Sequence, residues 1–130
     1  MENKPIKILI IDDEADFRRT MEFWFKSKGY IVNTTGDIEL ALQMIKENLA
    51  SIIFLDLVMP QVDGVELLKK IREISPDVPV IIISAYVGDK EKIKKLDALG
   101  IDGVFYKGAD FQEGLNLLEV ALRKHRKIEK

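Results

Sequence analysis

Four apolar runs in the sequence each end in polar side chains that could handle phosphate or a metal ion. They are residues 7–13 ending on Asp12 and Asp13, 51–56 ending on Asp56, 78–84 ending on Ser84, and 103–107 ending on Lys107. Apolar runs separated by helical segments are typical of buried parallel strands, and ligands bind at the carboxyl ends of such strands. We therefore expect three carboxylates, one hydroxyl and one ammonium to meet at one edge of a sheet. Such a set is suited to a divalent metal and a phosphoryl group.

The carboxylates require a cation if they lie close together. Like charges about 4 Å apart repel by roughly 4 kcal/mol at an effective dielectric near 20. All-oxygen ligands beside a phosphate favour Mg²⁺ or Mn²⁺ over zinc or copper. A strand-end carboxylate such as Asp56 can also accept a phosphoryl group as an aspartyl phosphate. Taken singly, Asp12 or Asp13 could cap a helix that begins near Ala15, and Asp56 could bond nearby backbone N–H groups.

The segments between the apolar runs have the spacing of amphipathic helices. The sequence predicts strands over 6–11, 30–35, 52–56, 79–84 and 103–106, and helices over 15–28, 37–48, 65–75, 88–99 and from about Asp110 onward. Strict alternation of strands and helices implies right-handed crossovers and a parallel sheet with helices on both faces.

The composition is that of a single folded domain. The chain has 130 residues, of which 47% are hydrophobic and 32% are charged, so it can bury a full core. It has no cysteine, which excludes disulfides and thiolate metal sites, and its net charge of −2 gives no bulk preference for nucleic acid. No run approaches the ~18 apolar residues needed to span a bilayer. We expect a cytoplasmic location, a domain over residues 1–125, and a tail or linker over 126–130.

The acidic pair Asp12-Asp13, the segment D-L-V-M-P-Q-V-D-G at 56–64, the pair Ser84-Ala85 and then Lys107 follow one another at domain-scale spacing. In this order they resemble the receiver domain of two-component response regulators, over nearly the whole chain. The resemblance implies an α/β, flavodoxin-like (βα)5 fold with a five-stranded parallel sheet of order 2-1-3-4-5 and helices on both faces.

The resemblance also assigns a role to the polar residues. Asp56 would be the phosphoacceptor, Lys107 would supply a fixed counter-charge, and the Ser84 hydroxyl would turn inward to bond a phosphoryl oxygen. Asp13 and Asp56 would bind Mg²⁺ or Mn²⁺ directly, Asp12 would act mainly through water, and the backbone carbonyl of Val58 would complete the protein ligands. The chain would catalyse its own phosphorylation and dephosphorylation, and would not be an enzyme acting on other substrates.

Receiver domains take the phosphoryl group from a sensor histidine kinase, a phosphotransfer protein or a small phosphodonor. They pass a signal to a downstream output protein or domain through the fourth helix, fifth strand and fifth helix, a surface that could also pair two copies as a dimer. The resemblance implies neither membrane association nor direct nucleic-acid binding. The basic stretch with Lys90, Lys92, Lys94 and Lys95 is interpreted as a solvated face that could also dock an acidic partner.

Two positions depart from the family pattern. Lys107 is followed by Gly108, where receivers usually have a proline, often with a cis peptide bond. Because a non-proline cis bond costs about 2.5–4 kcal/mol, we expect a trans bond here. Val104 stands three residues before the lysine, where many receivers have a Tyr or Phe switch. This departure puts the usual coupling between Ser84 and a rotating aromatic in doubt.

Two other functions match parts of the pattern. A degenerate receiver that binds proteins without phosphorylation is opposed by the intact acidic triad, although Gly108 and Val104 favour it. A metal-dependent phosphatase with an aspartyl nucleophile generally needs an acid two residues after that nucleophile, and this position is Val58. His125, the only histidine, is interpreted as a solvated residue near a helix C-terminus.

Val58 and Tyr86 occupy the two positions that flank the phosphoryl group in receiver domains. Neither side chain is a good base at neutral pH, and both should restrict the approach of water, so we predict a long-lived aspartyl phosphate. Val58→Asn combined with Tyr86→Glu should shorten its lifetime by about tenfold or more, a barrier change near 1.4 kcal/mol. Acid-quenched decay with Mg²⁺ present and kinase absent measures this, and equal decay rates would show that these side chains do not gate water.

Overall fold

The computed structural model describes residues 5–60, 62–85, 90–125 and 127. Its main sheet has five strands in the order β2-β1-β3-β6-β7, and every pairing is parallel. The strands are β1 (Lys7–Ile11), β2 (Ile31–Thr35), β3 (Ile52–Asp56), β6 (Val80–Ser84) and β7 (Gly103–Tyr106). Counted along the chain, this order is 2-1-3-4-5, so the predicted fold and topology are confirmed.

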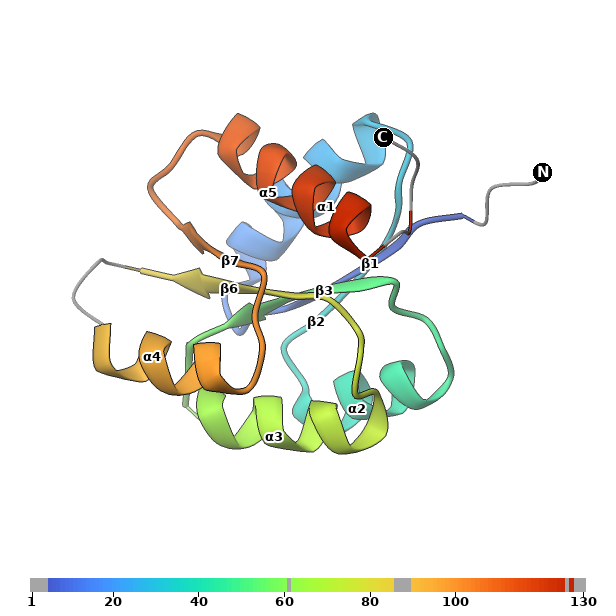
Figure 1. The fold of residues 1–130 in the computed structure, drawn as a ribbon. Helices are drawn as coiled ribbons and strands as arrows, with labels where there is room; N and C mark the ends of the chain where they lie inside the picture. Colours follow the sequence, from blue (N-terminus) through green and yellow to red (C-terminus); the bar gives the residue numbers. More distant parts are fainter. Residues whose placement is uncertain (1–4, 61, 86–89, 126, 128–130) are drawn as a thin grey trace.

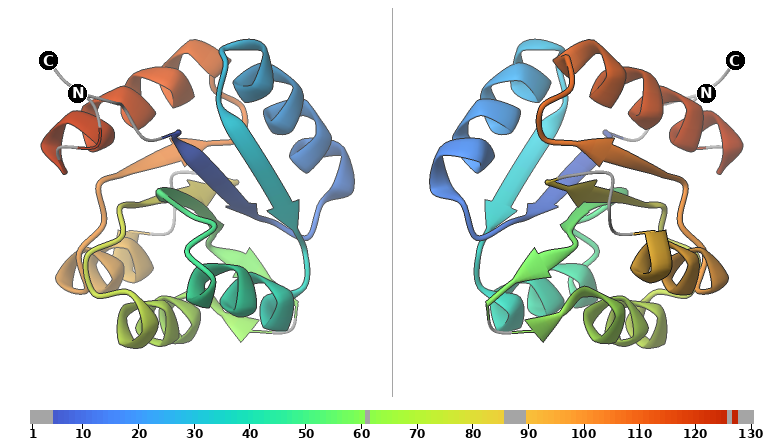
Figure 2. Two further views of the ribbon diagram at one scale, coloured as in Figure 1. Left: turned by 90° about the vertical axis from the view of Figure 1, so that its right-hand side faces the viewer. Right: turned by 90° about the vertical axis from the view of Figure 1, so that its left-hand side faces the viewer.

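Helices cover both faces of the sheet (Figures 1 and 2). They are α1 (Ala15–Ser27), α2 (Ile38–Lys46), α3 (Gly64–Ile74), α4 (Lys90–Ala98) and α5 (Phe111–Lys124). In Figure 1, α1 and α5 lie on one face, and α2, α3 and α4 lie on the other. No helix in the described part of the chain is both long and apolar enough to cross a membrane.

Two apolar cores lie on the two faces of the sheet. Alternate residues of one strand serve different cores: Ile8 and Ile10 pack with residues of α1 and α5, while Leu9 and Ile11 pack with residues of α2, α3 and α4. Because both faces are covered, the central strands are apolar throughout. Figures 1 and 2 show the resulting three-layer arrangement, with the sheet in the middle.

The register of the sheet brings the predicted polar groups to one edge. Asp56 pairs with Ile83, and Ser84 pairs with Tyr106. Backbone hydrogen bonds extend this register just past the strands, since Asp12 donates to the Thr35 carbonyl at 3.1 Å. Lys107 likewise donates to the Ser84 carbonyl at 2.9 Å. The polar residues at the strand ends are therefore held in fixed positions relative to one another.

The segment after β3 contains two short strands that the sequence does not predict. Val58–Met59 (β4) and Val62–Asp63 (β5) form a two-stranded antiparallel ladder. Asp63 then caps α3, because its Oδ1 accepts a hydrogen bond from the Val65 amide at 3.0 Å. A Cβ on Gly64 would lie 2.7 Å from the Leu57 carbonyl oxygen, so this hairpin needs glycine there.

The contacts at two helix ends differ from the interpretation of the sequence. Asp37 and Asp110 cap α2 and α5 as N-cap residues. Neither Asp12 nor Asp13 is the N-cap of α1, since Glu14 holds that position and its side chain makes no capping bond. His125 ends α5 as expected, but it is not simply solvated, because its Nε2 lies 2.9 Å from Asp102 Oδ1.

Candidate functional site

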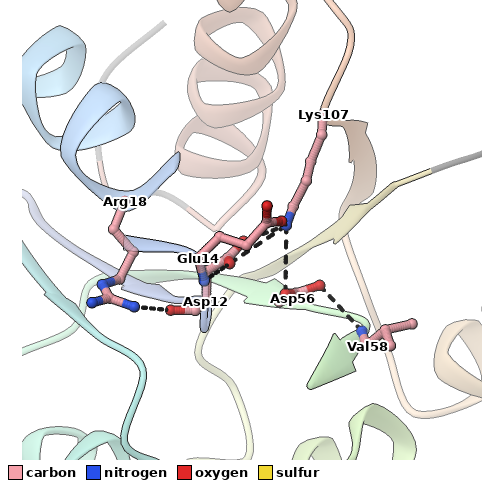
Figure 3. A network of polar contacts seen from close by, with 6 residues as sticks. All are labelled: Asp12, Glu14, Arg18, Asp56, Val58 and Lys107. Carbon is pink, nitrogen blue, oxygen red and sulfur yellow. Dashed lines mark hydrogen bonds and ion pairs between the residues drawn. The ribbon is translucent and has the colours of Figure 1, made fainter. Parts of the chain in front are cut away.

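Asp12 is held in place by contacts from three neighbouring segments. Its carboxylate is fully buried and its Oδ1 accepts a hydrogen bond from the Glu14 amide at 2.8 Å. Its amide is bonded to Thr35 at the end of β2. The Arg18 guanidinium, one turn into α1, donates to the Asp12 carbonyl at 2.5 Å (Figure 3). Asp12 therefore presents its carboxylate in one fixed orientation.

Gly36 makes the Arg18 contact possible. A Cβ at Gly36 would lie 2.8 Å from Arg18 Nη1 and 3.2 Å from the Asp12 carbonyl oxygen. Only a residue without a side chain therefore lets the turn after β2 pack closely against this hydrogen bond. The turn and α1 together fix the end of β1.

Asp12, Asp13 and Asp56 form a cluster of carboxylates. One oxygen from each lies within 4.8 Å of the others. Asp12 and Asp56 are buried, with Asp56 only 4% exposed, whereas Asp13 is exposed. Asp56 Oδ1 accepts a hydrogen bond from the Val58 amide at 3.1 Å (Figure 3). The cluster thus has two inner carboxylates and one that faces solvent.

Lys107 reaches into this cluster from the end of β7 (Figure 3). Its Nζ lies 3.1 Å from Asp12 Oδ2 and 3.6 Å from Asp56 Oδ2, and it also pairs with the Glu14 carboxylate. Burial lowers the pKa of Lys107, but hydrogen bonds to Glu14 and Asp12 and the nearby charges outweigh it, so the pKa is raised. Lys107 is therefore a permanent cation at neutral pH.

The cluster fits a hard divalent cation. Asp12 Oδ2 is buried and accepts no hydrogen bond among the described residues, although it forms an ion pair with the Lys107 ammonium. Burial, followed by the charge of Asp12, raises the pKa of Asp56 to about 7. A second positive charge among these oxygens would relieve this repulsion, and an all-oxygen donor set is the type that Mg²⁺ and Mn²⁺ prefer.

The raised pKa of Asp56 predicts a stability that depends on pH. Since the folded state holds the proton up to about pH 7 and the unfolded state releases it near 3.8, the free energy of unfolding should fall as the pH rises between these values. Asp56→Asn removes this penalty. In EDTA, the free energy of unfolding of the variant minus that of the parent should increase by on the order of 2 kcal/mol from pH 5 to pH 8. Urea unfolding at both values measures this, and a constant difference would contradict it.

The predicted site residues Asp12, Asp13, Asp56 and Lys107 lie together. Ser84, the last residue of β6, is 1% exposed at the same edge. Val58 lies beside Asp56 and is 57% exposed, while Tyr86 lies outside the described residues.

The structure describes both positions at which the sequence departs from the family pattern. Val104 packs against the core beside α2, α3 and α4, so the position three residues before Lys107 holds a partly buried aliphatic side chain. No cis peptide bond occurs in the described ranges, which confirms the trans bond expected between Lys107 and Gly108.

Sequence reasoning missed two residues of the site, Glu14 and Arg18. Both follow the acidic pair closely: Glu14 extends the acidic run, and Arg18 lies four residues further, one helical turn along the chain. That spacing places Arg18 over the start of α1, where its amide bonds to the Glu14 carbonyl. The spacing is a usable signal for a residue that supports the strand end.

Comparison with known proteins agrees with this geometry. Residues 8–119 match the family model described as the response regulator receiver domain. The chain is 34% identical over 128 residues to the probable transcriptional regulator ycf27 of Pyropia yezoensis and 30% identical over 120 residues to the response regulator MprA of Mycobacterium sp. (strain KMS). These matches cover 98% and 92% of this chain but 52% of each relative, so the chain spans about half the length of both.

Solved structures share the fold. The CheY-like receiver domain protein of Methanospirillum hungatei JF-1 superposes with a TM-score of 0.88 at 22% identity, covering 95% of this chain and 98% of that one. NtrX of Brucella abortus gives a TM-score of 0.87 at 26% identity, covering 95% of this chain and 28% of that one. The chain belongs to the response regulator receiver domain family. Members of this family are signalling modules of two-component systems and not classical enzymes.

Proposed function

We propose that this chain accepts a phosphoryl group on Asp56 from a phosphohistidine of a histidine kinase or phosphotransfer protein. The observation that carries the proposal is the cluster of three carboxylates with Lys107 at the carboxyl edge of the sheet. In this cluster, one Asp56 oxygen accepts a hydrogen bond from the Val58 amide and the other faces Lys107. That second oxygen is the one we assign as the nucleophile.

Each residue at the site has a separate task in this proposal. An Asp56 oxygen forms the new O–P bond while the N–P bond of the donor breaks. Lys107 supplies a positive charge beside the transferred group, and the Ser84 hydroxyl, at the end of the adjacent strand, donates to a phosphoryl oxygen. Lys107 already lies at the cluster before a phosphodonor arrives.

Asp12, Asp13, Asp56 and the Val58 carbonyl would hold Mg²⁺ or Mn²⁺. When bound, the ion neutralises phosphoryl oxygens during in-line transfer. Asp56 must lose its proton before it can act as ligand and nucleophile, and its raised pKa places this step near neutral pH. Both metal binding and phosphorylation should therefore strengthen as the pH rises through about 7.

Incubation with Mg²⁺ and acetyl phosphate, followed by intact-mass measurement, tests the proposal. We expect a stoichiometric gain of one phosphoryl group that is labile to base and absent when EDTA is present. A degenerate receiver that binds partners without phosphorylation would show no gain. An aspartyl phosphatase would turn over many equivalents of donor, but Val58 supplies no acid beside Asp56.

The signal would leave through the surface around α4, β7 and α5, reaching an output protein or domain or a second copy of the chain. The four lysines of α4 are all exposed, in agreement with the predicted solvated face (Lys90, Lys92, Lys94 and Lys95). An acidic surface on the output partner would complement them.

A further inference from the structure

Glu14 differs from the three clustered carboxylates in its surroundings. It is outside the group whose oxygens could share one metal ion. Its side chain is 62% exposed, whereas that of Lys107, its partner, is 17% exposed and that of Asp56 is 5% exposed. Glu14 is therefore the more exposed partner of Lys107, and an anion that approaches the Lys107 ammonium from solvent would meet its negative charge.

The charges at the site show why this position matters. With a divalent cation bound, the three clustered carboxylates would be balanced by the ion and by Lys107. Arg18 lies on the side of Asp12 away from Lys107 (Figure 3). Glu14 thus adds a further negative charge on the side of the site that faces solvent. It also pairs with the Lys107 ammonium, which a phosphoryl group would need as its own partner.

We propose that Glu14 is a specificity-determining residue that disfavours small anionic phosphodonors relative to phosphorylated proteins. The inference rests on the proposed phosphorylation of Asp56. A small donor has few contacts to make besides those of its negatively charged phosphoryl group. Glu14 repels this group and competes with it for the Lys107 ammonium. A protein donor adds the binding energy of its docking surface and can overcome this repulsion. Glu14 would thereby limit phosphorylation that bypasses the partner protein.

The test compares Glu14→Gln with the parent for two small donors of different charge. Acetyl phosphate is a dianion at neutral pH and phosphoramidate is mainly a monoanion. Because electrostatic work scales with donor charge, the second-order rate constant should rise about tenfold with acetyl phosphate and about threefold with phosphoramidate. Both gains should shrink at high salt, where screening shortens the range of the interaction.

Two further variants control for structural effects. Glu39→Gln removes a comparable exposed carboxylate from the first turn of α2 and should leave both rate constants unchanged. Glu14→Ser also removes the charge, and it supplies the side-chain cap that α1 lacks, so it should be at least as stable as the parent. It should reproduce the rate gains of Glu14→Gln.

A binding measurement provides a second readout that needs no phosphoryl transfer. Beryllofluoride, an anion that mimics a phosphoryl group, is titrated with Mg²⁺ present while the fluorescence of Trp24, the only tryptophan, is followed. Trp24 and Lys107 line the same cavity, which does not include the three carboxylates, so calorimetry is run in parallel. Glu14→Gln should bind the anion about threefold to tenfold more tightly.

The outcomes separate the two proposals. If neither the parent nor Glu14→Gln accepts a phosphoryl group from either donor, the proposed function fails, and the beryllofluoride titration alone decides the role of Glu14. If the parent is phosphorylated but Glu14→Gln and Glu14→Ser react at the parent rate, or more slowly, the Glu14 proposal is overturned. Equal gains for both donors would also overturn it, because a charge effect must follow donor charge.

Discussion

Asp56→Asn should abolish phosphoryl transfer to this chain. The amide that replaces the carboxylate is neutral and a poor nucleophile, and no described carboxylate takes the place of Asp56 beside both Lys107 and the Val58 amide. Intact mass after incubation with Mg²⁺ and acetyl phosphate should show no phosphoryl gain, a loss of at least about 10³-fold in rate.

The matched control for this experiment is Asp37→Asn. Asp37 is an exposed N-cap of α2, and asparagine caps helices about as well as aspartate, so the variant should be phosphorylated at the parent rate. Stoichiometric base-labile phosphate on Asp56→Asn would show that the acceptor is another residue. Asp12 and Asp13 would then be the first positions to examine.

Asp13→Ala should weaken Mg²⁺ binding by about tenfold or more, equivalent to about 1.4 kcal/mol. Asp13 is the exposed member of the cluster, so its loss removes a proposed ligand without opening the core. The free energy of unfolding without metal should stay within about 0.5 kcal/mol of the parent, as for most surface substitutions. Titration of Mg²⁺ by Trp24 fluorescence or calorimetry measures the loss.

Asp16→Ala is a suitable control, because Asp16 is exposed on α1 and pairs with Arg19 outside the cluster. Its Mg²⁺ affinity should match that of the parent. An unchanged affinity in Asp13→Ala would place the metal site elsewhere. A parent affinity that is flat from pH 6 to pH 8 would contradict the raised pKa of Asp56, since proton release near pH 7 must accompany binding.

The sequence alone determined the architecture and most of the site. Apolar strands that alternate with amphipathic helices allow few topologies, because parallel crossovers are right-handed and ligands bind at the carboxyl edge. Asp56 and Lys107 could be placed at that edge from chain order alone, before any coordinates. The hairpin of β4 and β5 escaped prediction, because strands of two residues are too short to show any periodicity.

Only the tertiary structure decided how these groups face one another. Asp12 and Asp13 are neighbours of the same type, yet one is buried and the other is exposed, because the Thr35 carbonyl and Arg18 fix the backbone at Asp12. The Glu14–Lys107 pair joins residues 93 positions apart. Such contacts depend on where the chain brings distant side chains to within a few ångströms, and neither local propensity nor residue spacing encodes that distance.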